Sequence, residues 1–278
     1  FADLNRYAIR PSKSMGILYD QRDEDAEITR KVVETVSFFR EFVEKEKTSI
    51  SPKSRRLFTL NNLSNANKDL LSQVNGYEAE KVRIANSFWE KVGNVIPEWK
   101  SVIDYKLTAG EVREDYIHTQ GVTLRAIAKA GSELIKMDPK GWEHKLEALG
   151  EINWRRSEKA WNGRAIENGK LRNTLPNINL TAIFIKQRLQ IPLNKDEKQM
   201  DDFRKWPLSR DKGGVHTNSG IPNRAYYLLA EGLTLEGLGS SIGKDKAEKL
   251  AYSTMVNLTR DSDFQAAAAL MLTSAEAR

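Results

Sequence analysis

The sequence contains no cysteine, few histidines and no long apolar run, and each absence narrows what the chain can do. Without cysteine there is no disulfide framework and no thiol chemistry, which fits a reducing compartment, so we expect a cytoplasmic protein. No stretch approaches the roughly 18 apolar residues of a membrane helix, and no charged-then-apolar leader is present, so we expect no membrane partner. We also expect no cofactor, because no phosphate-binding Gly-x-x-x-x-Gly-Lys-Ser/Thr loop occurs.

The histidines are too few and too far apart for a zinc peptidase. The chain has three, His118, His144 and His216, and no two of them are four residues apart, so the His-Glu-x-x-His motif is absent. In such enzymes a bound zinc ion activates the attacking water, and this sequence offers no ligand set to hold the ion. We therefore predict a chain with no metal site and no enzymatic activity.

The residues that are present indicate a mainly α protein with two parts. Of its 278 residues, 40% are hydrophobic and six are tryptophan, which is enough to bury real cores. Apolar residues recur at helical spacing over 23–47, 57–74, 77–96, 108–137, 142–149 and 179–189. The run that follows Asn194 is charged and poor in apolar residues, as in a linker or a solvated helix end. We expect an N-terminal multi-helix domain over 1–198, a linker over 199–210 and a small C-terminal helical domain over 211–278.

Three basic segments are candidates for contact with phosphate groups, because guanidinium, ammonium and hydroxyl groups all donate to anionic oxygens. The first lies within 1–14. The second is the loop over 47–56, which carries four hydroxyls and four cations ahead of a predicted helix start. The third lies within 151–189, where eight basic and three acidic residues hold most of the net charge of +6. The candidate residues are Arg6, Arg10, Lys13, Lys53, Arg55, Arg56, Arg155, Arg156, Arg164, Lys170 and Arg172.

Each basic segment also has a plainer interpretation. The third segment is compatible with a solvated surface that forms ordinary salt bridges. In the loop, Ser51 or Ser54 is expected to cap the helix that follows. Trp154 and Trp161 favour the other interpretation, because aromatic and amide side chains among guanidinium groups are typical of nucleic-acid surfaces. The residues alone leave both interpretations open.

A family resemblance runs through "FADLNRYAIRPSKS", "GILYDQRD", "EKTSISPKSRRLFTL", "FWEKVGNVIPEW", "VREDYIHTQGVTLRAIAKAG" and "LPNINLTAIFIKQRLQIPL". In order and spacing these segments resemble the DGQHR-domain proteins of the DndB family, which belongs to bacterial DNA phosphorothioation (sulfur modification) systems. The resemblance covers roughly residues 1–195 and implies the remainder of a DGQHR-type α/β protein. The Asp-Gly-Gln-His-Arg signature is absent and would lie upstream of Phe1, so we expect the chain to be part of something larger.

The C-terminal part resembles a different family. The run "DKGGVHTNSGIPNRAYYLLAEG" and the segment "IGKDKAEKLAYSTMVNLTRDSDFQAAAALMLTSA" are similar to the C-terminal helical domain of thermolysin-family zinc metallopeptidases. In that family the histidine of this motif donates a hydrogen bond to the oxyanion of the tetrahedral intermediate, and the aspartate supports it. By resemblance, His216 and Asp211 would take these catalytic roles. Because the zinc motif is absent, we expect this half-site to be inactive.

The leading hypothesis is a DNA-binding regulatory or accessory protein of a phosphorothioation system, which the first resemblance implies. Its cations would contact backbone phosphates and position the protein without reading bases. The alternative is a thermolysin-type zinc metallopeptidase, or an inactive remnant of one. A third hypothesis is a helical module that self-associates or binds a partner protein, since the apolar face within 1–14 needs something to pack against.

Overall fold

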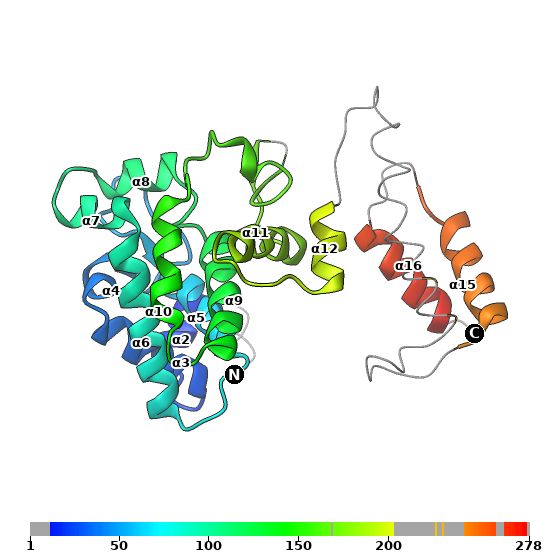
Figure 1. The fold of residues 1–278 in the computed structure, drawn as a ribbon, viewed down its shortest axis with the longest axis horizontal. Helices are drawn as coiled ribbons and strands as arrows, with labels where there is room; N and C mark the ends of the chain where they lie inside the picture. Colours follow the sequence, from blue (N-terminus) through cyan, green and yellow to red (C-terminus); the bar gives the residue numbers. More distant parts are fainter. Residues whose placement is uncertain are drawn as a thin grey trace, which may run out of the picture. The chain divides into compact units, whose positions relative to one another are not determined.

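The computed structural model describes residues 12–167, 169–202, 226, 230, 242–259 and 264–276. They fall into two compact units, Phe1–Glu197 and Lys198–Arg278, and each is described by itself (Figure 1). The described parts of both units are built mainly of helices, which confirms the predicted fold class. None of the described helices is long and apolar enough to cross a membrane.

The first unit is a layered bundle of helices with two very short strand pairs. Its helices are α2 (Lys13–Tyr19), α3 (Glu24–Thr35), α4 (Ser37–Phe42), α5 (Leu60–Leu71), α6 (Glu78–Val95), α7 (Pro97–Ile103), α8 (Ala109–Asp115), α9 (Gly121–Met137), α10 (Trp142–Lys145) and α11 (Leu175–Arg188). Short 3-10 helices cover Leu146–Glu151 and Lys159–Trp161. Helix α12 (Lys195–Asp202) begins in this unit and extends past its last residue, Glu197. Strand β1 (Val43–Glu44) pairs in parallel with β2 (Phe58–Thr59), and β3 (Ile166–Glu167) pairs antiparallel with β4 (Lys170–Leu171).

Helix α9 forms the centre of this unit, and it packs against α5 on one side and α11 on another (Figure 1). Twelve of its 17 residues are buried, so apolar and small side chains occupy nearly the whole circumference. Gly131 is required by this packing, since a Cβ atom there would lie 2.2 Å from Cε2 of Phe88. The closeness of the helices therefore depends on a missing side chain.

The core around α9 is rich in stacked aromatic rings. Phe38 and Trp99 lie parallel with ring centroids 5.0 Å apart. Trp154 and Trp161 stack at 5.3 Å, and both are buried. Because their ring faces are covered, these two tryptophans cannot contact nucleic acid, and the part of the sequence argument that depends on them is wrong.

Two of the predicted helices are broken in the structure. The predicted helix over 23–47 is interrupted at Val36, whose backbone is extended, and it gives way to strand β1 after Phe42. The break turns the phenylalanines of α4 into the core, where the burial of aromatic area outweighs helix continuity. The predicted helix over 108–137 is interrupted between α8 and α9, because the amide of Ile117 donates to the carbonyl of Trp154 at 3.0 Å.

Two predicted helix starts also differ in the structure. Helix α5 begins at Leu60 and is capped by Thr59, whose hydroxyl accepts from the amide of Asn62. The expected caps Ser51 and Ser54 are wrong, because strand β2 intervenes between the loop and the helix. Pro97 ends one predicted helix but also begins α7. Helix α11 begins at Leu175, ahead of the predicted range, and the charged run after Asn194 forms α12, one of the two structures expected for that run.

In the second unit the structure describes α15 (Lys244–Val256) and α16 (Phe264–Glu276), which pack against each other. Ala247, Leu250 and Thr254 are buried on α15. The hydroxyl of Ser253 lies 3.1 Å from that of Ser274 and ties the two helices together. Helix α15 starts at Lys244, with Gly243 at a φ of 80° immediately before it.

The close approach at Gly131 gives a direct test of the core. We expect Gly131→Ala to lower the free energy of unfolding by roughly 1–3 kcal/mol, because the new methyl group overlaps the ring of Phe88. Urea denaturation measures this change. Gly16→Ala on α2 is the matched control. No atom lies within 4 Å of a Cβ placed there, so that change should stabilise the protein by roughly 0.5–1 kcal/mol. Equal effects of the two changes would contradict the packing described.

Candidate nucleic-acid interface

Helix α8 stands between two of the predicted basic segments. It begins with a capping box, in which Thr108 accepts from the amide of Glu111 at 3.2 Å and the Glu111 carboxylate accepts from the amide of Thr108 at 2.8 Å. These bonds hold the pKa of Glu111 below its ordinary value. The short helix is therefore well defined at its start, although it spans only two turns. The loop over 47–56 contacts the side chain of Arg113 on this helix, and Arg156 contacts the helix backbone at Arg113 and Asp115.

The loop is anchored by a single guanidinium group. Arg113 of α8 donates to the carbonyl oxygens of Ser51 (2.9 Å), Pro52 (2.8 Å) and Ser54 (2.9 Å), and also to that of Arg56. Burial lowers the pKa of Arg113. The base of the loop is closed by the β1–β2 pair and by the amide of Leu57, which donates to Phe42. A loop with few apolar side chains thus acquires a defined path.

The anchored loop presents its own cations to solvent. Lys53, Arg55 and Arg56 are all exposed, although the Arg56 guanidinium also bonds the carbonyl of Glu41. Arg55 lies over the ring of Tyr105, 5.6 Å from its centroid. In the described part of the chain, no carboxylate lies within ion-pair distance of these three cations. Their positive charge is therefore not cancelled locally.

Arg155 and Arg156 reach the same helix from the other side and behave differently. The Arg156 guanidinium turns inward and donates to the carbonyl of Arg113 at 2.7 Å. The backbone amide of Arg156 donates to the backbone carbonyl of Asp115 at 2.8 Å. Burial lowers the pKa of Arg156, while nearby Glu114 and Asp115 oppose this shift. Arg155 is exposed and lies over the ring of Tyr116, 4.9 Å from its centroid.

We take the exposed cations that both segments place near this helix as the candidate site. We call it the α8 basic surface and define it as Lys53, Arg55, Arg56 and Arg155. Two sequence segments that lie about a hundred residues apart contribute to it. Arg113 joins them, because its guanidinium holds the loop and its carbonyl accepts from Arg156.

The other predicted cations lie elsewhere. Arg164 donates to the carbonyl of Ala160 at 3.1 Å and lies over the ring of Phe184. Lys170 is an exposed residue of strand β4, and Arg172, also exposed, donates its amide to Ala165. Arg6, Arg10, Asp211 and His216 lie outside the described residues.

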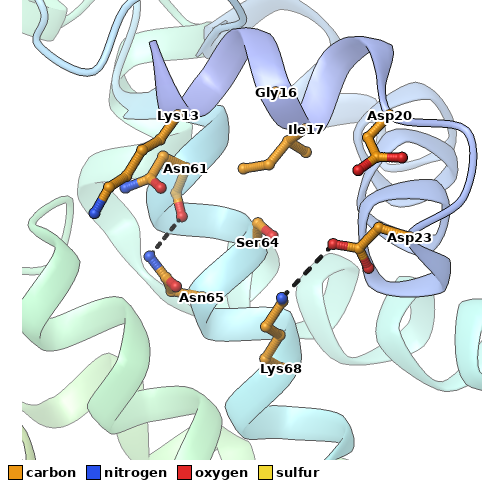
Figure 2. Close-up of a pocket in the computed structure, with 9 residues that line it drawn as sticks. All are labelled: Lys13, Gly16, Ile17, Asp20, Asp23, Asn61, Ser64, Asn65 and Lys68. Carbon is orange, nitrogen blue, oxygen red and sulfur yellow. Dashed lines mark hydrogen bonds and ion pairs between the residues drawn. The ribbon is translucent and has the colours of Figure 1, made fainter. Parts of the chain in front are cut away.

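Lys13 lies at the start of α2, next to the beginning of the loop. The neighbouring Ser14 donates to the carbonyl of Lys47 at 3.1 Å. Lys13 also lines a pocket of about 270 Å³ between α2 and α5, together with Gly16, Ile17, Asp20, Asp23, Asn61, Ser64, Asn65 and Lys68 (Figure 2). Figure 2 shows Lys13 and the asparagines on one side and the two aspartates on the other. Because carboxylates share this pocket, it differs in character from the α8 basic surface.

A buried histidine lies beneath the Tyr116 ring and was not singled out by the sequence. Tyr116 stacks on His118 with ring centroids 5.3 Å apart. The Nδ1 atom of His118 accepts from the indole of Trp99 at 2.9 Å, so its proton lies on Nε2, which faces Oε2 of Glu98 at 3.4 Å. Neither of these last two atoms makes a well-aligned hydrogen bond. Burial lowers the pKa of His118, and Glu98 opposes this shift.

The carboxyl group of Glu98 titrates under several influences. Burial alone would raise its pKa, but His118, the backbone amide of Glu98 and the positive charge of Arg155 together hold that pKa below its ordinary value. An ionised Glu98 next to a neutral His118 is therefore the resting state near neutral pH. The Tyr116 ring lies between this histidine and Arg155, whose charge acts on Glu98.

The described residues do not fit a zinc centre. His118 is fully buried against Trp99 and Glu98, whereas His144 is exposed on α10. In the described ranges, no group of three histidine, cysteine or acidic side chains is placed to hold a metal ion. We therefore derive no chemical step that involves zinc.

Comparison with known proteins identifies two families along the chain. The family described as DNA-sulfur modification-associated (DndB) matches residues 1–192, and the thermolysin metallopeptidase alpha-helical domain matches residues 174–278. Because the first match covers more than half of the sequence, the chain belongs to the DndB family. Both resemblances stated from the sequence are confirmed. The two matches overlap on α11.

Three curated relatives match through the second part. Protease PrtS of Photorhabdus sp. (strain Az29) is 45% identical over 73 residues, which cover 26% of this chain and 18% of that protein. Bacillolysin of Brevibacillus brevis is 46% identical over 65 residues, 23% of this chain and 12% of its own length. Thermolysin of Alicyclobacillus acidocaldarius subsp. acidocaldarius is 44% identical over 63 residues, which cover 22% of this chain and 12% of that protein. The chain spans less than a fifth of these relatives and matches the helical domain, not the catalytic domain. No solved structure matches the chain.

Removal of the Arg113 guanidinium should loosen the loop selectively. We expect Arg113→Ala to lower the free energy of unfolding by roughly 1.5–3 kcal/mol, because four carbonyl groups lose a charged donor. Hydrogen exchange at the amide of Ser54 should accelerate much more than exchange within α5. The free energy of unfolding of Arg113→Lys should lie between those of the wild type and Arg113→Ala, since one ammonium group cannot reach all four oxygens. Arg83→Ala, at an exposed position paired with Glu80, is the control and should change stability by less than about 0.5 kcal/mol.

The buried histidine should make stability fall in mild acid. An unfolded chain protonates His118 near its ordinary pKa of 6.5, whereas the folded chain does so only at lower pH. The free energy of unfolding should therefore decrease as pH falls from about 7 to about 5, by at most about 1.4 kcal/mol per pH unit. Urea denaturation across this range measures the slope. His118→Asn, which keeps an acceptor for Trp99, should flatten it, while His144→Asn should not. An unchanged slope in the first variant would contradict the assignment.

Proposed function

We propose that this chain is a DNA-binding regulatory or accessory protein of a bacterial DNA phosphorothioation system, and that it acts in the cytoplasm. Membership of the DNA-sulfur modification-associated family supports the link to that system. The α8 basic surface supports DNA as the ligand. We further propose that the chain is not itself an enzyme, in keeping with the absent zinc motif and the buried position of His118.

The observation that carries the proposal is the unpaired charge around α8. Lys53, Arg55 and Arg155 are exposed, and within the described residues none of them has a carboxylate at ion-pair distance. Glu98 lies near Arg155, and Glu114 and Asp115 lie near Arg156, but none of these carboxylates forms an ion pair with the exposed cations. A cluster of cations without such pairs attracts a polyanion. Guanidinium groups also match phosphate oxygens in geometry. The contacts would be made to backbone phosphates and would position the protein without reading base sequence.

Salt dependence of duplex binding tests this proposal. We expect the full chain to bind duplex DNA with an affinity that falls steeply as salt rises, with a slope of about −0.9 in log K against log [salt] for each phosphate contact. The double variant Lys53→Gln, Arg155→Gln should reduce the magnitude of that slope by roughly two such contacts. Affinity for unrelated duplex sequences should fall by similar factors. Fluorescence anisotropy with labelled duplexes measures both quantities.

A charge-matched variant provides the control for this measurement. Arg83→Gln, Lys136→Gln removes two exposed cations from α6 and α9 and should leave the slope unchanged. The proposal would be overturned by a wild-type chain that fails to bind duplex DNA at low salt. It would also be overturned if both double variants changed the slope equally, since general charge would then explain the binding.

A second candidate function rests on the other matched family. The likeness to protease PrtS, bacillolysin and thermolysin supports a thermolysin-type peptidase, or an inactive remnant of one, in the C-terminal part. His216 and Asp211 would then support an oxyanion by resemblance. Stoichiometric zinc in the purified chain, with casein cleavage that His216→Ala abolishes, would favour this function over DNA binding. We expect neither zinc nor cleavage.

A further inference from the structure

Tyr105 occupies an unusual backbone position between α7 and α8. Its φ is 58°, in the left-handed region that strongly favours glycine. The hydrogen bonds around it form a Schellman motif, in which the amide of Lys106 donates to Ser101 at 2.8 Å and the amide of Tyr105 donates to Val102 at 3.2 Å. Such motifs usually place glycine at this position. A bulky aromatic residue is therefore held there in a strained conformation.

The strained backbone presents the ring to solvent. Tyr105 is 80% exposed, even though the Arg55 guanidinium lies over its ring. Of the contacts between cations and rings in the described part of the chain, this one alone involves an aromatic residue that is more than half exposed, since Tyr116 is buried and Phe184 half-buried. The side chain gains little from burial, so core packing does not explain the strain. Strain of this kind is a common mark of functional positions.

Arg55 is itself held in place beneath this contact. The carbonyl groups of Ser54 and Arg56, on either side of it in the chain, both accept from Arg113. The ring and the guanidinium thus belong to two anchored segments, and α7 and α8 pack against each other (Figure 1). The pair is a preorganised flat surface at the edge of the α8 basic surface. Preorganisation reduces the entropy lost when a ligand is bound.

We infer that Tyr105 and Arg55 form a stacking platform for an unpaired nucleobase, so that the chain favours nucleic acid with an extrahelical or single-stranded base over fully paired duplex. This inference rests on the proposed function, because the neighbouring cations would hold the phosphates on either side of that base. A paired base has both faces covered by its neighbours and cannot reach the ring. An unpaired base stacks on tyrosine or on the plane of an arginine, whatever its sequence.

The charge around the platform favours this ligand over a cationic or protein one. Lys106 follows Tyr105 directly, Lys100 lies one turn earlier on α7, and Lys53 belongs to the same loop as Arg55; all three are exposed, and Lys106 pairs with Asp104 at 3.1 Å. A ligand cation would be repelled by these ammonium groups and would compete with Arg55 for the ring. An acidic peptide would meet the charge but has no flat face to stack. A nucleotide supplies both an anionic group and an aromatic face.

Substitution of Tyr105 separates a structural role from a binding role. We expect Tyr105→Gly to raise the midpoint of thermal unfolding, because glycine adopts the left-handed conformation without strain. The same variant should bind a duplex with one bulged base roughly ten-fold more weakly, while its affinity for the fully paired duplex should stay within about two-fold. Loss of affinity in a more stable protein cannot arise from unfolding. Tyr105→Trp should retain the preference for the bulged duplex.

The experiment uses the full chain and a bulged 2-aminopurine as the spectroscopic probe. Stacking on Tyr105 should quench the fluorescence of the 2-aminopurine base in the wild type and not in Tyr105→Gly. Tyr77→Ala, which removes a tyrosine that is 90% exposed at the start of α6, is the matched control and should change neither affinity nor quenching.

The possible outcomes distinguish this inference from the function on which it rests. Equal wild-type affinity for paired and bulged duplexes, unchanged in Tyr105→Gly, would overturn the platform and leave DNA binding intact. Failure of every duplex to bind would overturn the proposed function itself. Displacement of the bulged duplex by polyglutamate at equal charge concentration would also count against the platform, because it would show that charge alone governs binding.

Discussion

Burial of α9 on almost every side is the constraint on which the rest of the first unit depends. The helix packs between α5 and α11, and the missing side chain at Gly131 lets the ring of Phe88 approach it. The segment that leads into α9 is in turn tied to the backbone of Trp154. That tie brings residues 155–156 beside α8, and the cations around α8 follow from it. A surface property is thus fixed by the packing of the interior.

The way in which Arg113 is satisfied determines the charge of the surface above it. A buried arginine commonly pairs with a carboxylate, and the pair is then neutral. Arg113 instead donates to carbonyl oxygens, whose dipoles stabilise the guanidinium without cancelling its charge. Arg113 therefore adds positive charge at the α8 basic surface without being touched by a ligand, against the negative charge of Glu111, Glu114 and Asp115 on the same helix. Long-range attraction of this kind affects the rate of association more than its specificity.

The sequence predicts the helical class and most helices, because amphipathic spacing reports local burial directly. It does not predict the breaks at Val36 and before α9, since both depend on partners distant in the chain. The candidate cations could be named from composition, but their grouping could not. Arg113 gave no local signal, because its acceptors lie about sixty residues earlier. Tyr105 gave none either, since its conformation follows from the Schellman bonds and not from its residue type.

The parallel β1–β2 pair has a consequence for how the loop between the strands can vary. Both ends of the segment after Glu44 and before Phe58 are clamped by the pair, Ser14 holds the carbonyl of Lys47, and the carbonyl contacts of Arg113 begin at Ser51. The short stretch between Lys47 and Ser51 contributes few side chains to the interior. Insertions or deletions there should alter loop-closure entropy only slightly, since that entropy changes slowly with length. Divergent lengths of this stretch are therefore compatible with an unchanged helical bundle.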